Sequence, residues 1–221
     1  MIVDMRVYTY TPAQFTGFVK AYTEVGHAIV SRHLGYMTGV FISASSTANR
    51  TLQFFAYEDN DHRDMCRQAL RSDPAWLEFI RGAALAISVQ ENTILRPSDH
   101  SPAQDVAALK ALAETTTARD RVFEMRTRAF HPGKAHAGAG TGELQLRTDA
   151  GEEVLAQFTA DTGLGDRVLT FSAFRSAGER DAINTALGAS PAMSAILQTV
   201  QPALVSEVRE LWLPLPCSPL R

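Results

Sequence analysis

The chain has 221 residues, of which 45% are hydrophobic, enough for one large core or two domains of about 100 residues each. Its formal charge of −3, from 21 basic and 24 acidic residues, argues against the basic surface that attracts nucleic acid. No apolar run approaches the roughly 20 residues that span a bilayer, and residues 1–4 do not resemble a signal sequence, so we expect a cytoplasmic protein with neither nucleic acid nor a membrane as partner.

Residues 1–98 predict an α+β domain. Thr11 and Pro12 suit the start of a helix, and Gly35 is expected as its C-cap. The expected elements are a strand at 2–10, a helix at 12–33 with a potential break at Gly26, strands at 36–45 and 50–57, helices at 60–71 and 75–86, and a strand at 87–95. This order is that of a ferredoxin-like domain, with an antiparallel sheet and helices on one face.

A sequence repeat shows that this domain occurs twice. Residues 50–57, RTLQFFAY, return 117 positions later as residues 167–174, RVLTFSAF. A repeat of this length is the size of a domain, which predicts two tandem ferredoxin-like units. The same offset, without a gap, relates Arg63 to Arg180, Pro74 to Pro191, and Pro97 to Pro214.

The second half repeats the pattern with one irregular segment. We expect units at 1–98 and 121–214, joined by a linker at 99–120 with a short helix at 102–114, and a proline-rich tail at 215–221. Five glycines between Gly133 and Gly151 disfavour a regular helix, so that helix is predicted to be short or irregular. The remaining expected elements are strands at 122–130, 154–159, 167–174 and 204–213, and helices at 177–187 and 191–200.

The first unit resembles the NIPSNAP family, which belongs to the wider class of dimeric α+β barrel proteins. The resemblance implies two four-stranded sheets packed face to face, within one chain or between chains, and a homo-oligomer. Gln53 and Phe55 stand where the family usually has histidine and tryptophan. The motifs that carry the resemblance are MIVDMRVY at 1–8, RHLG at 32–35, FAY at 55–57, DPAW at 73–76 and QEN at 90–92.

The second unit looks like a degenerate copy, because it keeps Arg126 but has Arg128 in place of Tyr8 and lacks the RHLG motif. Related α+β barrels include cofactor-independent oxygenases, isomerases, cyclases, haem-binding enzymes and dimerisation modules. We therefore expect a cofactor-independent enzyme of small-molecule metabolism or biosynthesis that acts on an apolar or aromatic substrate. The alternatives are a non-catalytic small-molecule-binding or assembly protein, and a haem protein.

Three residues are candidates for catalysis. Arg6 and Tyr8 share a strand face, where the guanidinium can stabilise an enolate or carboxylate, and His33 can transfer protons near neutral pH. The structural alternatives are an Asp4–Arg6 ion pair, repeated by an acid and Arg126 in the second unit, and a helix-capping role for His33. The residues predicted to bind the substrate are Asp4, Gln53, Phe55, Tyr57, Trp76 and Gln90.

No histidine or cysteine spacing indicates a metal site, and Cys66 and Cys217 are predicted to be free thiols. The glycines at 138–142 lack the lysine and serine or threonine of a phosphate-binding loop, so a flexible loop or lid is expected there.

The two copies of the third strand distinguish the core from the site. Leu52, Phe54 and Ala56 recur identically as Leu169, Phe171 and Ala173, which predicts the core face. The opposite face changes from Gln53, Phe55 and Tyr57 to Thr170, Ser172 and Phe174, which predicts a site in the first unit.

Overall fold

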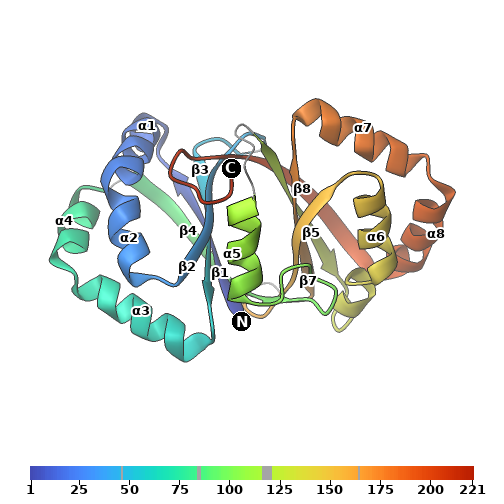
Figure 1. Cartoon of the computed structure of the whole chain (residues 1–221), viewed down its shortest axis with the longest axis horizontal. Coiled ribbons are helices and arrows are strands. Elements are labelled where there is room, and N and C mark those ends of the chain that lie inside the picture. Colours follow the sequence, from blue (N-terminus) through green and yellow to red (C-terminus); the bar gives the residue numbers. More distant parts are fainter. Residues whose placement is uncertain (46, 84–85, 116–120, 164) are drawn as a thin grey trace.

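The computed structural model describes residues 1–45, 47–83, 86–115, 121–163 and 165–221. The first unit (Figure 1) consists of β1 (Ile2–Tyr10), α1 (Pro12–Ala21), the π-helical turn η1 (Tyr22–Gly26), α2 (His27–His33), β2 (Tyr36–Ser43), β3 (Arg50–Tyr57), α3 (Asn60–Ser72), α4 (Pro74–Ala83) and β4 (Ile87–Pro97). After α5 (Val106–Thr115), the second unit consists of β5 (Val122–Phe130), η3 (Ala135–Gly138), α6 (Thr141–Asp149), β6 (Glu153–Ala160), β7 (Arg167–Phe174), α7 (Ala177–Gly188), α8 (Pro191–Val200), η4 (Gln201–Ala203) and β8 (Leu204–Pro214).

The eight strands form one closed barrel in the order β1-β3-β2-β8-β5-β7-β6-β4, and all the pairings are antiparallel. Each unit contributes a ferredoxin-like sheet, and the two sheets join where β2 meets β8 and where β4 meets β6. The prediction of two α+β units with facing antiparallel sheets is confirmed, and the barrel closes within one chain. Helices α1–α4 cover the outside of one sheet and α6–α8 cover the other (Figure 1).

The barrel interior is the main core, and its composition follows the strand alternation. The repeated face of β3 and β7 points inward, as predicted, together with Val3 and Val7 of β1. At the centre, four aromatic rings from both units meet, with ring centroids about 5 to 6 Å apart, as aromatic pairs prefer. They are Phe41, Phe54, Phe123 and Phe171.

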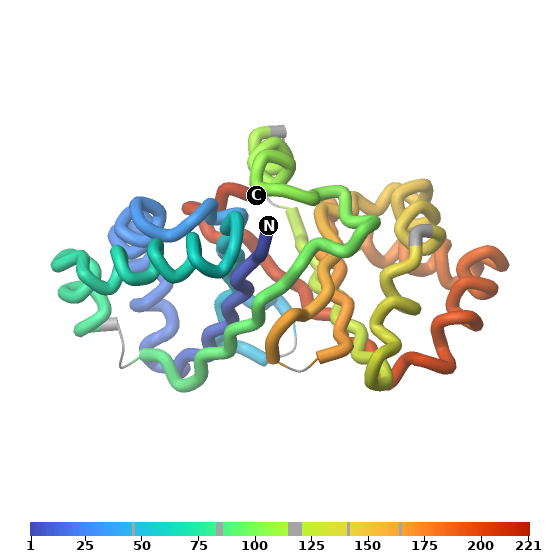
Figure 2. The backbone as a smooth tube through the Cα atoms, turned by 90° about the horizontal axis from the view of Figure 1, so that it is seen from below, coloured from blue at the N-terminus to red at the C-terminus, as the bar shows by residue number. Residues whose placement is uncertain are grey.

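The repeat extends beyond the predicted boundaries to the C-terminal tail. The Ser98 backbone N–H donates to Gln157 O and the Gln157 N–H to Ser101 Oγ. The tail makes the same two bonds 117 residues away, from Leu215 to Val40 and from Val40 to Ser218. Each segment therefore covers one edge of a strand that the sheet leaves unpaired, whereas α5 lies outside the repeat and projects from one end of the barrel (Figure 2).

Several predicted details differ from the structure. The helix expected at 12–33 does not break at Gly26 but passes through a π-helical turn that ends there. Leu34 is the C-cap of α2, and Gly35 is required instead because a Cβ there would lie 2.3 Å from Ala56 O. Residues 138–142 are not a free loop, because Gly138 is buried against Phe130 and α6 begins at Thr141.

Within the part of the chain that the structure describes, no helix is both long enough and apolar enough to cross a membrane.

Candidate functional site

A cavity of about 190 Å³ lies in the first unit, between the outer face of its sheet and the helices that cover it. The sheet forms its floor, which combines polar and apolar side chains, and the helices form its mostly apolar wall. Small-molecule sites usually combine such surfaces. The floor consists of Arg6, Tyr8 and Tyr10 of β1, Gln53 and Phe55 of β3, and Ile87 and Gln90 of β4. The wall includes Phe18, Tyr22, Val30, Arg67, Leu70, Arg71, Trp76, Phe79 and Ile80.

The charged part of the floor is built around a fully buried carboxylate. Asp4 is 0% exposed, and its Oδ2 accepts hydrogen bonds from Arg6 Nε at 3.2 Å and Nη2 at 3.1 Å. Arg6 Nη1 donates to Tyr8 Oη at 3.0 Å. Burial lowers the pKa of Arg6, but the interactions with Tyr8 and Asp4 raise it by more than burial lowers it. The net shift of the Arg6 pKa is therefore upward. The guanidinium is thus permanently charged and held in one orientation.

Helix α3 adds two more arginines to the same carboxylate. Arg63 Nε donates to Asp4 Oδ2 at 2.9 Å, and Arg67 Nη1 lies 3.7 Å from that oxygen, too far for a hydrogen bond. Arg67 Nη1 is buried and has no hydrogen-bond partner among the described residues. Arg67 also lines the cavity, so its guanidinium, with one buried donor that lacks a hydrogen-bond partner among the described residues, belongs to the cavity wall.

Aromatic residues of the helices form the opposite wall. Phe18 packs on Tyr10, with ring centroids 4.4 Å apart, and Trp76 stacks on Phe79 at 5.6 Å. Phe79 reaches its place because Gly26 has no side chain, and a Cβ there would lie 2.6 Å from Phe79 Cζ.

The π-helical turn that ends at Gly26 begins with Tyr22, whose hydroxyl is buried without a partner among the described residues. Burial raises the pKa of Tyr22, so at neutral pH it presents an O–H donor. Turns of this kind often occur at functional sites.

Six of the nine residues proposed from the sequence line this cavity. Their shared feature is that they belong to the outer sheet face or, for one, to α4. They are Arg6, Tyr8, Gln53, Phe55, Trp76 and Gln90.

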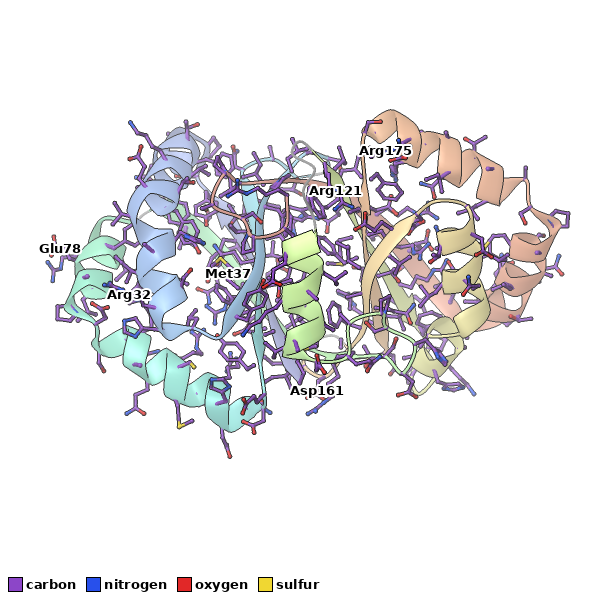
Figure 3. All side chains as sticks on the ribbon, viewed as in Figure 1. Arg32, Met37, Glu78, Arg121, Asp161 and Arg175 are labelled. Atoms are coloured by element: carbon purple, nitrogen blue, oxygen red, sulfur yellow. The ribbon has the colours of Figure 1, made fainter. Side chains whose placement is uncertain are left out.

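His33, proposed as the acid–base residue, is not among the residues that line the cavity. Its Nε2 lies 2.6 Å from Asp73 Oδ2, at the junction of α3 and α4. This hydrogen bond is the main cause that lowers the pKa of Asp73. Arg32 also reaches Asp73, at 3.4 Å, from the helical side of the first unit, away from the barrel (Figure 3). The contact ties the end of α2 to the start of α4, which gives His33 a structural partner outside the cavity.

Asp4 and Tyr57 also lie outside the cavity lining. Asp4 acts through Arg6, as the alternative of a structural ion pair anticipated. Tyr57 is 0% exposed and packs under Gly35, where a Cβ would lie 2.7 Å from its ring. Both are buried, and neither is among the residues that line the cavity.

In the second unit, an ion network occupies the equivalent place. Arg126, the counterpart of Arg6, lies with Nη1 3.1 Å from Glu143 Oε1. Glu143 also binds Arg128 at 2.5 Å and Arg147 at 2.8 Å. The counterpart of Phe55 is Ser172, whose hydroxyl donates to an acid of the same network.

Two further carboxylates complete this network. Glu152 binds Arg147 at 2.9 Å, and Glu207 binds Arg128 at 2.5 Å. The arginines Arg126, Arg128 and Arg147 therefore face three glutamates, and Glu207 also binds Arg209 at 2.7 Å. Burial raises the pKa of Glu143, but the three arginines outweigh it and lower that pKa to about 2.

The sequence did not predict the cavity residues that come from the helices. The most important of them are Arg67, Tyr22 and Phe79. One signal could have found the first of them. The 117-residue offset aligns Arg67 with Asn184 and Arg71 with Gly188, so both cations are specific to the first unit.

Among the described residues, no group of three or more histidine, cysteine, aspartate or glutamate side chains could hold a metal ion. Cys66 and Cys217 are free thiols, as predicted.

Comparison with known proteins places this geometry in context. The family model described as NIPSNAP matches residues 3–102. A NIPSNAP family protein from Agrobacterium tumefaciens is 30% identical, and the match covers 47% of this chain and 98% of that protein, with a TM-score of 0.46. None of the curated proteins matches the chain.

Two more distant structures match almost the whole chain. A candidate monooxygenase from Lactobacillus acidophilus is 9% identical, with coverage of 96% of this chain and 92% of its own, and a TM-score of 0.63. An anthrone oxidase-like protein is 13% identical, with coverage of 96% and 90% and a TM-score of 0.58. At these identities the likeness shows the shared barrel fold only.

Glu143 provides a test of the ion network through pH. Its folded pKa lies below the usual value, so its stabilisation is present above about pH 4.5 and is lost as pH falls toward 2. We expect Glu143→Gln to lower the free energy of unfolding at pH 7 by about 3 kcal/mol, as measured by urea denaturation. The difference from the wild type should shrink steadily between pH 4.5 and 2.

Asp149→Asn, on the exposed side of the same helix, is the control and should change the free energy of unfolding by less than about 0.5 kcal/mol. A Glu143→Gln variant as stable as the wild type at pH 7 would contradict the network's role.

Proposed function

Because the chain belongs to the NIPSNAP family through its first unit, we propose that this unit is the functional half and that its cavity binds an apolar or aromatic small molecule. The difference between the two units carries this proposal. The first unit keeps a cavity with aromatic walls, whereas the second has an ion network at the equivalent place. A purely structural role would not need one unit to leave that space unfilled.

The proposed chemistry is that of a cofactor-independent enzyme, such as an oxygenase, isomerase or cyclase. Arg6 and Tyr8 are fixed together in the floor, and their donors can stabilise negative charge that develops on a substrate oxygen. Asp4 holds Arg6 from the side away from the cavity, so little reorganisation is needed when charge develops. This arrangement suits an enolate or a phenolate.

One observation favours the alternative, a non-catalytic binding protein. The described lining residues include no aspartate, glutamate or histidine, so the cavity lacks the commonest general bases. An enzyme with this site would need a substrate that is acidic itself. The size of the cavity also limits the ligand, because a cavity of about 150 Å³ holds benzene, and 190 Å³ leaves room for one ring with small substituents.

Binding of p-cresol, a neutral single-ring probe, tests the site by isothermal titration calorimetry. Ile80→Trp places a large side chain in the cavity wall and should weaken p-cresol binding by at least about 10-fold, as the loss of a well-filled apolar site predicts. Leu197→Trp changes the counterpart of Ile80 in α8 and should leave binding unchanged. Equal binding by both variants, or no binding by the wild type, would refute the proposed site.

Turnover separates the enzyme from the binding protein. For an enzyme that stabilises an enolate, we expect the protein to accelerate the exchange of solvent deuterium at the acidic C–H positions of phenylacetone, with hydroxide from solvent as the base that removes the proton, followed by NMR. Tyr8→Phe should then lower kcat by about 100-fold with little change in KM, because the lost donor acts mainly in the transition state. Binding of p-cresol without any acceleration of exchange would favour the binding protein instead.

A further inference from the structure

We infer that the ligand of the first unit is an acid: a single-ring aromatic carboxylate whose anionic group binds Arg67 and Arg6. This inference rests on the proposed function, since it concerns the same cavity. It is carried by the ion pairs around Asp4 and by the acid that the second unit places beside the counterpart of Arg6.

In the first unit, three arginines surround one buried acid. Among the described residues, Asp4 is the one carboxylate in hydrogen-bond or ion-pair contact with Arg6, and it is shared with Arg63 and Arg67 through a single oxygen. Arg63 has a second acid, because its Nη1 lies 3.2 Å from the exposed Asp64. Arg67 has no such second partner in the described contacts, and its Nη1 is buried without a hydrogen bond. A buried cationic donor of this kind is costly unless an acceptor reaches it.

The second unit shows where an acceptor would lie. Arg180 binds Glu124 at 2.5 Å, as Arg63 binds Asp4, so the inner ion pair is common to both units. The second unit then adds Glu143 from α6, which contacts the counterpart of Arg6 directly. In the first unit the residue 117 positions earlier is Gly26, which has no side chain. The first unit therefore lacks the carboxylate that neutralises this position in the second.

An aromatic carboxylate would both supply an acid beside the arginines and fill the apolar part of the cavity. Its carboxylate would take the place that Glu143 occupies in the second unit, and its ring would pack among Phe55, Phe79 and Trp76. A neutral ring would fill the same apolar space but leave Arg67 unsatisfied. The lining adds no acid among the described residues, so nothing in the cavity repels an anion.

The test compares benzoate with benzamide, an uncharged molecule of nearly the same shape, by isothermal titration calorimetry at pH 7. We expect the wild type to bind benzoate about 10- to 100-fold more tightly than benzamide, which is the range that a hydrogen bond to a charged group provides. Arg67→Gln should reduce this preference to less than about 3-fold, mainly through the loss of benzoate affinity. Arg32→Gln, on the exposed part of α2, is the control and should keep the full preference.

Failure of this inference is distinguishable from failure of the proposed function. If p-cresol and benzamide bind but benzoate binds no more tightly than benzamide, the acid is wrong and the aromatic site stands. If none of the three binds, the site itself is wrong. Retention of the full benzoate preference in Arg67→Gln, with the fold confirmed by circular dichroism, would also overturn the inference.

Discussion

The buried ion pair between the first strand and the following helix is the constraint on which the site depends. In the first unit it joins Asp4 to Arg63, and in the second it joins Glu124 to Arg180. A carboxylate removed from water needs such partners, and each pair fixes its helix on the sheet. Because both units share this ion pair, the two units can be compared residue by residue in the space between sheet and helices. Arg6 is oriented by the same Asp4. One carboxylate therefore holds both the helix and the arginine that is proposed to bind the ligand.

The two units satisfy the same scaffold in opposite ways. The second unit supplies its own acids, and Glu143 reaches Arg126 across the space between helix and sheet. In the first unit no acid of α1, η1 or α2 contacts Arg6 among the described contacts, and aromatic side chains enclose a cavity instead. A stable barrel needs both halves, because Phe54 of one unit packs on Phe171 of the other. The second unit thus completes the barrel, and the first unit contains the cavity.

Much of the fold could be predicted from the sequence, because alternation and repetition act along the chain. The core face of residues 50–57 was assigned correctly by comparing the copies. The extent of the repeat was underestimated, although Ser-Pro recurs at 101–102 and 218–219 with the same 117-residue offset. The site was harder to predict, since strand alternation identifies a sheet face but not the helix residues above it. His33 was assigned to the site because its type suits proton transfer, but its position at a helix end directs it to Asp73.

The central claim is that one unit of this barrel is open to an aromatic acid and the other is closed by its own charges. A crystal structure of the protein with benzoate tests it most directly. The account predicts one benzoate per chain, between the first sheet and α3, with its carboxylate about 3 Å from Arg67. Benzoate bound beside Glu143 in the second unit, or a first cavity filled by its own side chains, would contradict it.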